Sequence, residues 1–484
     1  MEYISTRGGA KSVSSAAAIL GGIAPDGGLF VPAQLPVCGA KAFYGLPYAQ
    51  AAQKVLQLFL TDYDPQFLQK AARDTYEGEN FSQKAGAVER VADGLYSLEL
   101  WHGPTCAFKD YALQLMPKLL CEAKTMQDDT GVTKILVATS GDTGKAALAG
   151  YAGLPGIRIA VFYPDHGTSE VQRLQMATQE GENVAVYAVN GNFDDAQTGV
   201  KRVFADKALA QKLAAKGEAL SSANSINWGR LVPQIVYYFY SYAQLVEKGF
   251  VKDGEPVDYC VPTGNFGDIL AGYYARRMGL PVGRLICASN KNNVLSDFLA
   301  TGTYDARRAF YKTASPSMDI LVSSNLERLL YHVSGDGAAV ARWMDELSKN
   351  GVYTVAQEVL FAIREVFTGG CASDEAAGAE LHRQFEENKY LCDPHTAVAF
   401  SVARTLRGEN PCVVVSTANP YKFPCDVLAA LGGGVPDDEF AAMRALEQKT
   451  GVSAPQSLAG LRQKPVRFET VIEKAGIGAA ALSL

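Results

Sequence analysis

The sequence predicts an α/β protein whose core consists of parallel β-sheets covered by helices. Short apolar runs typical of buried strands alternate with runs typical of helices through the middle of the chain. The chain has 484 residues, which is too long for one simple core and predicts two to four domains. Hydrophobic residues make up 48% and charged residues 20%, as in ordinary soluble globular proteins.

Strands and helices alternate between residues 134 and 206. Residues 134–139 (KILVAT) predict a buried strand, and the loop SGDTG that follows leads into a helix of small residues, KAALAGYAG. Runs of strand length and amphipathic runs of helix length then follow in turn. The predicted elements are a strand at 157–163, a helix at 171–178, a strand at 184–189 and a helix at 194–206.

A second alternating stretch begins at residue 257. The run VDYCVPT at 257–263 predicts a strand that leads through GNFG into a helix carrying ILAGYYARRMG, and the next strand is predicted at 284–288. Residues 412–416 (CVVVS) predict one more buried strand. This alternation predicts parallel sheets covered on both faces, and such sheets bind ligands in the loops at the carboxyl ends of their strands.

Two changes of pattern suggest domain boundaries. A helix-rich stretch at 48–74 precedes the α/β body, and the glycine-rich segment GGGVPDD at 432–438 resembles a linker. We therefore expect an N-terminal helical or mixed domain at 1–90, a catalytic body at 91–432 with a smaller lobe at roughly 134–215, and a C-terminal extension at 433–484.

Composition argues against several classes of protein. The net charge is −6 with both signs interspersed, which predicts no nucleic-acid or anionic-membrane partner. No run approaches the ~18 apolar residues of a membrane span, and the N-terminus lacks the apolar core of a secretory signal. The nine cysteines are scattered and never in CxxC spacing. We expect a cytoplasmic protein without disulfides or a structural metal.

The first candidate binding loop is SGDTG at 140–144. Backbone N–H groups at a helix N-terminus, flanked by two hydroxyls, suit a carboxylate or a phosphate. A nucleotide-binding Walker loop is excluded, because Thr139 replaces its first glycine and Ala146 its magnesium-binding hydroxyl residue. Taken alone, the segment is better explained as a tight turn with a helix cap.

The second candidate loop is TGNFG at 263–267, again between a strand and a helix. Its glycines allow an anion to approach the backbone, and Thr263 and Asn265 add side-chain donors. The GxGxxG pattern is absent, so a dinucleotide is not indicated.

The third candidate is HGPTCAFKD at 102–110, which contains Lys109. Most lysines are solvated surface charges, but this one follows the mainly apolar residues Cys106, Ala107 and Phe108. Desolvation lowers the pKa of a lysine and favours the neutral amine needed for Schiff-base chemistry.

These motifs together resemble the threonine synthase family. HGPTCAFKD is similar to that family's lysine motif for pyridoxal phosphate (PLP), and the resemblance covers nearly the whole chain in order, most closely to the long bacterial and fungal form. It implies PLP fold type II, shared with tryptophan synthase β, with two parallel-sheet α/β lobes and the cofactor between them. The other matching segments are YISTRGG, IAPDGGLFVP, SGDTG, SANSINWGRLVPQ, GNFGD, SPSMDILVSSNLERLL and VSTANPYKFP.

The resemblance implies roles for individual positions. Lys109 would bind PLP covalently and shuttle protons, the 264–267 loop would hold the cofactor phosphate, and Thr417 would contact the pyridine nitrogen. The implied cofactor-binding residues are Lys109, Asp142, Thr263, Gly264, Asn265, Phe266, Gly267 and Thr417.

The implied substrate contacts divide between the two ends of the substrate. Residues 140–143 would bind the α-carboxylate, and residues 225–230 the substrate phosphate, with Arg230 as the counter-charge and Lys291 and Arg328 as less certain helpers. The implied substrate-binding residues are Ser140, Gly141, Thr143, Ser225, Asn227 and Arg230.

Two positions depart from related enzymes. Asn419 stands where the family usually has histidine, which puts any histidine-dependent step there in doubt. Asp142 stands where related PLP enzymes often carry asparagine, although long threonine synthases share the aspartate. We interpret His395 as a helix-start residue and His102 as a structural neighbour of the lysine loop.

The implied activity is the PLP-dependent conversion of O-phosphohomoserine and water to threonine and phosphate, without a metal. Two alternatives stay open: a phospho-lyase of the same family that releases a keto acid, and a non-catalytic paralogue that binds a metabolite. Retention of Lys109, both anion loops and Thr417 argues against the paralogue. The expected assembly is a monomer or weak homodimer.

Overall fold

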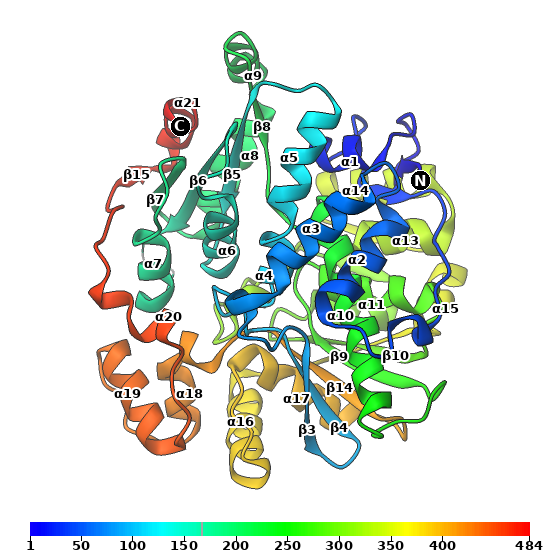
Figure 1. Ribbon diagram of the computed structural model, residues 1–484, viewed down its shortest axis with the longest axis vertical. Coiled ribbons are helices and arrows are strands. Elements are labelled where there is room, and N and C mark those ends of the chain that lie inside the picture. The colour runs from blue at the N-terminus through cyan, green and yellow to red at the C-terminus, as the bar shows by residue number, and fades with distance from the viewer. Residues whose placement is uncertain (166–167) are drawn as a thin grey trace.

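Two β-sheets form the two lobes of the protein (Figure 1). The structure is a computed structural model that describes residues 1–165 and 168–484. The large sheet has the order β13-β10-β9-β14-β4-β3, and its neighbouring strands are parallel except β4 and β3. Its strands are β3 (Ala87–Ala92), β4 (Leu95–Glu99), β9 (Val257–Pro262), β10 (Val282–Ser289), β13 (Phe367–Cys371) and β14 (Cys412–Ser416).

The small sheet has the order β15-β7-β6-β5-β8 and is parallel throughout. Its central strands are buried because their apolar side chains cover both faces, as expected for a sheet between helices. The sequence predicts that the smaller lobe ends near residue 215, but its sheet extends further because β8 follows that position. Its strands are β5 (Val132–Ala138), β6 (Ile157–Pro164), β7 (Val184–Asn190), β8 (Glu218–Ser221) and β15 (Val471–Glu473).

Helices cover both sheets, which confirms the predicted α/β class. The predicted strands at 134–139, 157–163, 184–189, 257–263, 284–288 and 412–416 are confirmed with ends that move by at most two residues. The helices from residue 110 to residue 214 are α4 (Asp110–Leu113), α5 (Met116–Met126), α6 (Asp142–Tyr151), α7 (Glu170–Ala177), α8 (Phe193–Ala205) and α9 (Lys207–Ala214).

The large lobe has its own helices and a small hairpin of β11 (Thr303–Asp305) and β12 (Val352–Thr354). Helix α10 is buried on nearly every side and packs against α2 and α11. The helices are α10 (Trp228–Glu247), α11 (Gly267–Arg277), α12 (Val294–Thr301), α13 (Leu326–Ser334), α14 (Gly337–Asn350), α15 (Gln357–Arg364), α16 (Asp374–Asn388), α17 (Pro394–Leu406) and α18 (Pro424–Ala430). No helix in the described ranges is long and apolar enough to cross a membrane.

The N-terminal region packs on the large lobe. It contains an antiparallel pair, β1 (Tyr3–Ser5) with β2 (Phe30–Pro32), and α1 (Ser15–Gly21). The helix-rich stretch expected at 48–74 is confirmed as α2 (Tyr48–Phe59) and α3 (Pro65–Tyr76). Helix α3 begins there because the Asp64 side chain accepts a hydrogen bond from the Gln66 N–H and Pro65 occupies the first turn.

The C-terminal segment crosses from the large lobe to the small one (Figure 1). After the glycine-rich stretch, α19 (Glu439–Thr450) and α20 (Gln456–Ala459) precede β15 and α21 (Ile477–Ser483). Val471 pairs with Ala188 at the edge of the small sheet, and Ile477 joins that lobe's hydrophobic core. The small lobe is therefore built from strands β5 to β8 together with β15 and α21, which follow much later in the sequence. The domain limits drawn from the sequence stay a prediction.

The 3₁₀ helices lie in the connections between these elements. Of these, η3 and η4 contribute directly to the site described below. They are η1 (Ala40–Phe43), η2 (Gly78–Phe81), η3 (Pro316–Met318), η4 (Pro420–Lys422), η5 (Leu461–Gln463) and η6 (Lys474–Gly476).

The close approach of α6 to α4 generates a stability prediction. A Cβ added at Gly150 would lie 1.9 Å from the Leu113 carbonyl oxygen, so a side chain there would force the two helices apart. We expect Gly150→Ala to lower the free energy of unfolding by about 1–3 kcal/mol, measured by denaturant titration. Gly434→Ala is the control, because nothing lies within 4 Å of its added Cβ. Equal stability of the two variants would contradict this packing.

Candidate active site

The Lys109 loop is shaped by the neighbouring carboxylate of Asp110. This buried side chain accepts hydrogen bonds from the Thr105 hydroxyl at 2.7 Å and the Thr105 N–H at 2.8 Å. Backbone bonds tie the loop to the segment after β14: the Phe108 N–H donates to the Thr417 carbonyl at 2.8 Å, and the Asn419 N–H donates to Cys106 at 3.0 Å. The loop is therefore fixed at the carboxyl edge of the large sheet.

Lys109 lies in a nearly dry environment, with 9% of its surface exposed. Its Nζ donates to the Ser317 hydroxyl at 3.1 Å, lies 3.4 Å from Asp142 Oδ2 and lies 4.9 Å from the centre of the Phe108 ring. Burial lowers the pKa of Lys109; Asp142 opposes this shift, while Lys422 adds to it. The site thus favours the neutral, nucleophilic amine.

The SGDTG loop joins β5 to α6. Gly141 has a φ of +143°, and a Cβ there would lie 2.5 Å from the Gln172 side chain, so the loop requires glycine at this position. The Thr139 hydroxyl accepts the N–H groups of Gly141 at 2.9 Å and Gly144 at 3.0 Å. Within the described chain, the hydroxyls of Ser140 and Thr143 have no such partner, which leaves them available to a ligand.

The TGNFG loop joins β9 to α11. Phe266 has a φ of +61°, and α11 begins at the next residue, with its first N–H groups facing the loop. A Cβ added at Gly264 would lie 2.7 Å from the Ser317 carbonyl oxygen, so this glycine allows the loop to lie against η3. Asn325 fixes the loop from the opposite side by donating its N–H and Nδ2 to the Asn265 carbonyl, at 3.1 and 3.0 Å. The Thr263 hydroxyl donates to Val261 O at 2.7 Å.

Arg230 is a buried cation with spare hydrogen-bonding capacity. Only 3% of it is exposed, and one terminal N–H donates to the Ala223 carbonyl. Its Nε has no partner, and no ion pair joins it to a carboxylate in the part of the chain that is described. Burial lowers the pKa of Arg230 to about 10. A buried charge without a counter-ion is costly, so this arrangement suits an anionic ligand.

The segment before Arg230 leads into the long helix α10. Helix α10 begins only at Trp228, so Ser225 precedes it and Asn227 is its N-cap. The Asn227 side chain accepts the Gly229 N–H at 2.8 Å and donates to Ile19 O at 2.8 Å. Ser225 accepts from Asn325 Nδ2 at 3.2 Å, beside Gly267. A ligand contact by the Asn227 side chain stays a prediction, and it would replace one of these bonds.

The two helper cations occupy different environments. Arg328 is fully buried and donates to the Phe30 carbonyl, the Asn325 side chain and the Ile226 carbonyl, so it holds the segment before α10 in place. Lys291 is exposed, and its ammonium lies 4.2 Å from the centre of the Tyr311 ring. Of the three cations considered for the substrate phosphate, Arg230 alone combines burial with a free donor.

The residues after β14 complete the site. Thr417 is 6% exposed, and its N–H donates to the Thr396 hydroxyl at 3.3 Å. Across the described residues, its own hydroxyl has no hydrogen-bond partner. Asn419 caps η4 by accepting the Tyr421 N–H at 3.0 Å, which gives it a structural role.

The histidines near the site are structural. His395 lies in the first turn of α17, as expected, and its Nδ1 donates to Asp393 Oδ2 at 2.6 Å. Its Nε2 accepts the Ser317 N–H at 3.1 Å, so it positions a residue that contacts Lys109. His102 lies 2.7 Å from Glu99 Oε2.

Three residues join the site that sequence reasoning did not single out: Ser317, Gln172 and Lys422. Gln172 Nε2 donates to Asp142 Oδ1 at 2.9 Å, and the fully buried Lys422 lies 2.6 Å from the same oxygen. Ser317 and Lys422 lie inside segments that carried the family resemblance, but no local pattern distinguished them.

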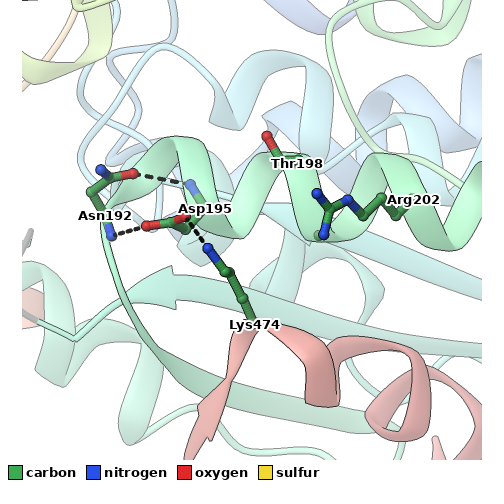
Figure 2. A pocket seen from close by; sticks show the side chains of 6 residues that line it. Asn192, Asp195, Thr198, Arg202 and Lys474 are labelled. Atoms are coloured by element: carbon green, nitrogen blue, oxygen red, sulfur yellow. Dashed lines mark hydrogen bonds and ion pairs between the residues drawn. The ribbon is translucent and has the colours of Figure 1, made fainter.

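A separate pocket of about 170 Å³ lies on the small lobe between α8 and η6 (Figure 2). Lys474 pairs there with Asp195 at 3.2 Å, and Asn192 and Asp195 form a reciprocal cap of α8. None of the residues predicted to bind cofactor or substrate lines it.

A parallel-sheet fold with a buried lysine between two anion-binding loops is typical of PLP-dependent enzymes of fold type II. The family model of pyridoxal-phosphate-dependent enzymes matches residues 89–418, and those of the threonine synthase N-terminus and C-terminal region match residues 2–76 and 396–479. The chain belongs to the threonine synthase family.

Individual relatives agree with this assignment. Threonine synthase of Pseudomonas aeruginosa is 42% identical over 88% of this chain and 89% of that protein. Human threonine synthase-like 1 is 40% identical over 86% of this chain, but the chain spans only 57% of that protein's length. The crystal structure of PLP-bound threonine synthase from Brucella melitensis superposes with a TM-score of 0.88 at 36% identity, covering 99% of this chain and 98% of that one.

The residues of the site fit pyridoxal phosphate, the cofactor of this family. Lys109 is buried and favours the neutral amine that forms a Schiff base. The 263–267 loop offers a helix N-terminus to a phosphate, and Gly264 leaves no room for a side chain. The free hydroxyl of Thr417 suits a ring nitrogen. The individual cofactor contacts stay predictions.

Mutations in the TGNFG and SGDTG loops should have different effects. We expect Gly264→Val to weaken retention of PLP at least about tenfold, because its Cβ would collide with the Ser317 carbonyl. Thr143→Ala removes only a free hydroxyl, so it should keep PLP and lose substrate affinity. Cofactor content after dialysis, measured by absorbance, separates the two. The reverse result would exchange the roles of the loops.

Proposed function

We propose that this protein is a threonine synthase that uses PLP to convert O-phospho-L-homoserine and water into L-threonine and phosphate. The observation that carries the proposal is that a lysine amine and an arginine, whose Nε has no hydrogen-bond partner among the described residues, are both buried. Such a site offers a nucleophile and proton carrier together with a counter-charge for a phosphorylated substrate. Family membership supports the same reaction.

The reaction divides among the residues of the site. PLP, when bound, supplies an electron sink for charge that develops at the substrate Cα. Lys109 removes the Cα proton and later returns a proton there, which its lowered pKa permits. Ser140 and Thr143 orient the substrate carboxylate through their free hydroxyls. Arg230 holds the phosphate that leaves Cγ, and the buried setting strengthens this contact.

We also propose the remaining ligand contacts, the cellular location and the oligomeric state. Asp142, Thr263, Asn265, Phe266 and Gly267 would bind the cofactor together with Lys109, Gly264 and Thr417, while Gly141 and Ser225 would line the substrate site. The nine cysteines are all free, which supports a cytoplasmic location. A monomeric or weakly dimeric state and the lack of a nucleic-acid partner remain predictions, the latter supported by the net charge of −6.

The proposal is tested by incubating purified enzyme and PLP with O-phosphohomoserine and identifying both products. We expect phosphate and threonine in equal amounts. Phosphate with a keto acid would instead indicate the phospho-lyase alternative, and neither product would indicate a non-catalytic paralogue. Lys109→Ala is the matched control, and we expect its turnover to fall at least about a thousandfold because nucleophile and proton carrier are lost together.

The phosphate assignment gives a second prediction. Arg230→Lys keeps the charge but loses the planar guanidinium and its free Nε, so kcat/KM for O-phosphohomoserine should fall at least about tenfold. Binding of threonine, which lacks the phosphate, should change far less. Equal losses for both ligands, or none, would move the phosphate site to Lys291 or Arg328.

A further inference from the structure

A second lysine, Lys422, is buried beside Lys109 and has no part in the reaction described above. Lys422 in η4 is fully buried, and the carboxylate of Asp142 lies between the two lysines. Asp142 Oδ1 contacts Lys422 Nζ at 2.6 Å, whereas Asp142 Oδ2 lies 3.4 Å from Lys109 Nζ. Lys422 also donates to the Thr105 carbonyl at 3.0 Å, which fixes its ammonium.

Lys109, Lys422 and Asp142 bring two cations and one anion together in a dry cluster, and the nearby carboxylate of Asp110 is bonded by the Thr105 hydroxyl and N–H and not by either lysine. Burying an unpaired charge is strongly unfavourable, so one of the two lysines is driven to release its proton. The two lysines are not equivalent. Lys422 makes a short charge-assisted bond, whereas Lys109 has a longer contact with the same carboxylate and donates to the neutral hydroxyl of Ser317. The neutral partner is therefore Lys109.

The remaining charged groups around the cluster act on Lys109 in both directions. Arg230 adds positive potential at Lys109 and acts in the same direction as Lys422. Burial raises the pKa of Asp268 to about 6, so above that pH its carboxylate opposes Lys422 by favouring the ammonium form of Lys109, while two tyrosine hydroxyls bond its Oδ1. His395 accepts a backbone N–H at Nε2 and bonds Asp393 through Nδ1. The charged groups around Lys109, Asp142 and Lys422 are Asp110 from α4, Arg230 from α10, Asp268 from α11 and His395 from α17.

We propose that Lys422 is a positioning residue that keeps Lys109 in its neutral form by occupying Asp142 as a permanent counter-ion. It acts on Lys109 only through the carboxylate between them. Gln172 supports the arrangement by bonding the oxygen of Asp142 that faces Lys422. The inference rests on the proposed role of Lys109 but does not depend on which substrate the enzyme uses.

The test measures the titration of Lys109 in apoenzyme. PLP is added at a series of pH values, the lysine adduct is fixed with borohydride, and its rate of formation at Lys109 is followed by peptide mass analysis. The midpoint is the pH at which the rate of adduct formation reaches half of its plateau value. In Lys422→Met, Asp142 faces Lys109 alone and stabilises the ammonium form, so this midpoint should rise by about one pH unit or more. Lys422→Arg retains the charge and should restore a midpoint close to that of the wild type. A purely structural role would lower the melting temperature of the variants without moving the midpoint.

Asp142→Asn provides the opposite perturbation. It leaves the charge of Lys422 unopposed near Lys109, so the midpoint should fall by about one unit or more. An unchanged midpoint in folded Lys422→Met overturns the inference. If Lys422→Met fails to fold, Asp142→Asn decides, and an unchanged midpoint there has the same meaning. Absence of any wild-type adduct at Lys109 would instead overturn the proposed function.

Discussion

The buried ion pair between Asp142 and Lys422 joins the two lobes at the active site. Asp142 begins a helix of the small lobe, whereas Lys422 follows the central strand β14 of the large lobe. Both side chains are almost completely buried, so their attraction offsets part of the cost of removing two charges from water. The interaction fixes the SGDTG loop opposite Lys109, and the position of this loop relative to the lysine depends on it.

The large sheet brings the other loops of the site together. The loops after β4, β9 and β14 all leave the sheet at its carboxyl edge, which brings Lys109, the TGNFG loop and Thr417 together. Backbone hydrogen bonds between residues 106–108 and 417–419 then set the distance between two of these loops. Side chains do the chemistry, but main-chain bonds determine where they lie.

Much of the fold could be predicted from sequence because buried parallel strands are runs of apolar residues. The run CVVVS at 412–416 coincides with β14 for this reason. Strand β15 has three residues, two of them exposed, so no local pattern distinguishes it. The lysine motif and both glycine-bearing loops could likewise be found by inspection, whereas the partners of Asp142 could not. Lys422 is 280 positions from Asp142 in the sequence and looks like any solvated lysine until the fold buries it.

The pairing of β15 with β7 has a consequence for synthesis of the protein in the cell. Until residues 471–473 leave the ribosome, the edge of β7 has no partner, and unpaired strand edges invite association with other chains. The small lobe therefore completes its sheet only after residues 471–473 have been synthesised, although most of its strands are made much earlier. Nascent chains of this protein should depend on chaperones over that interval more than an enzyme whose lobes are contiguous in sequence.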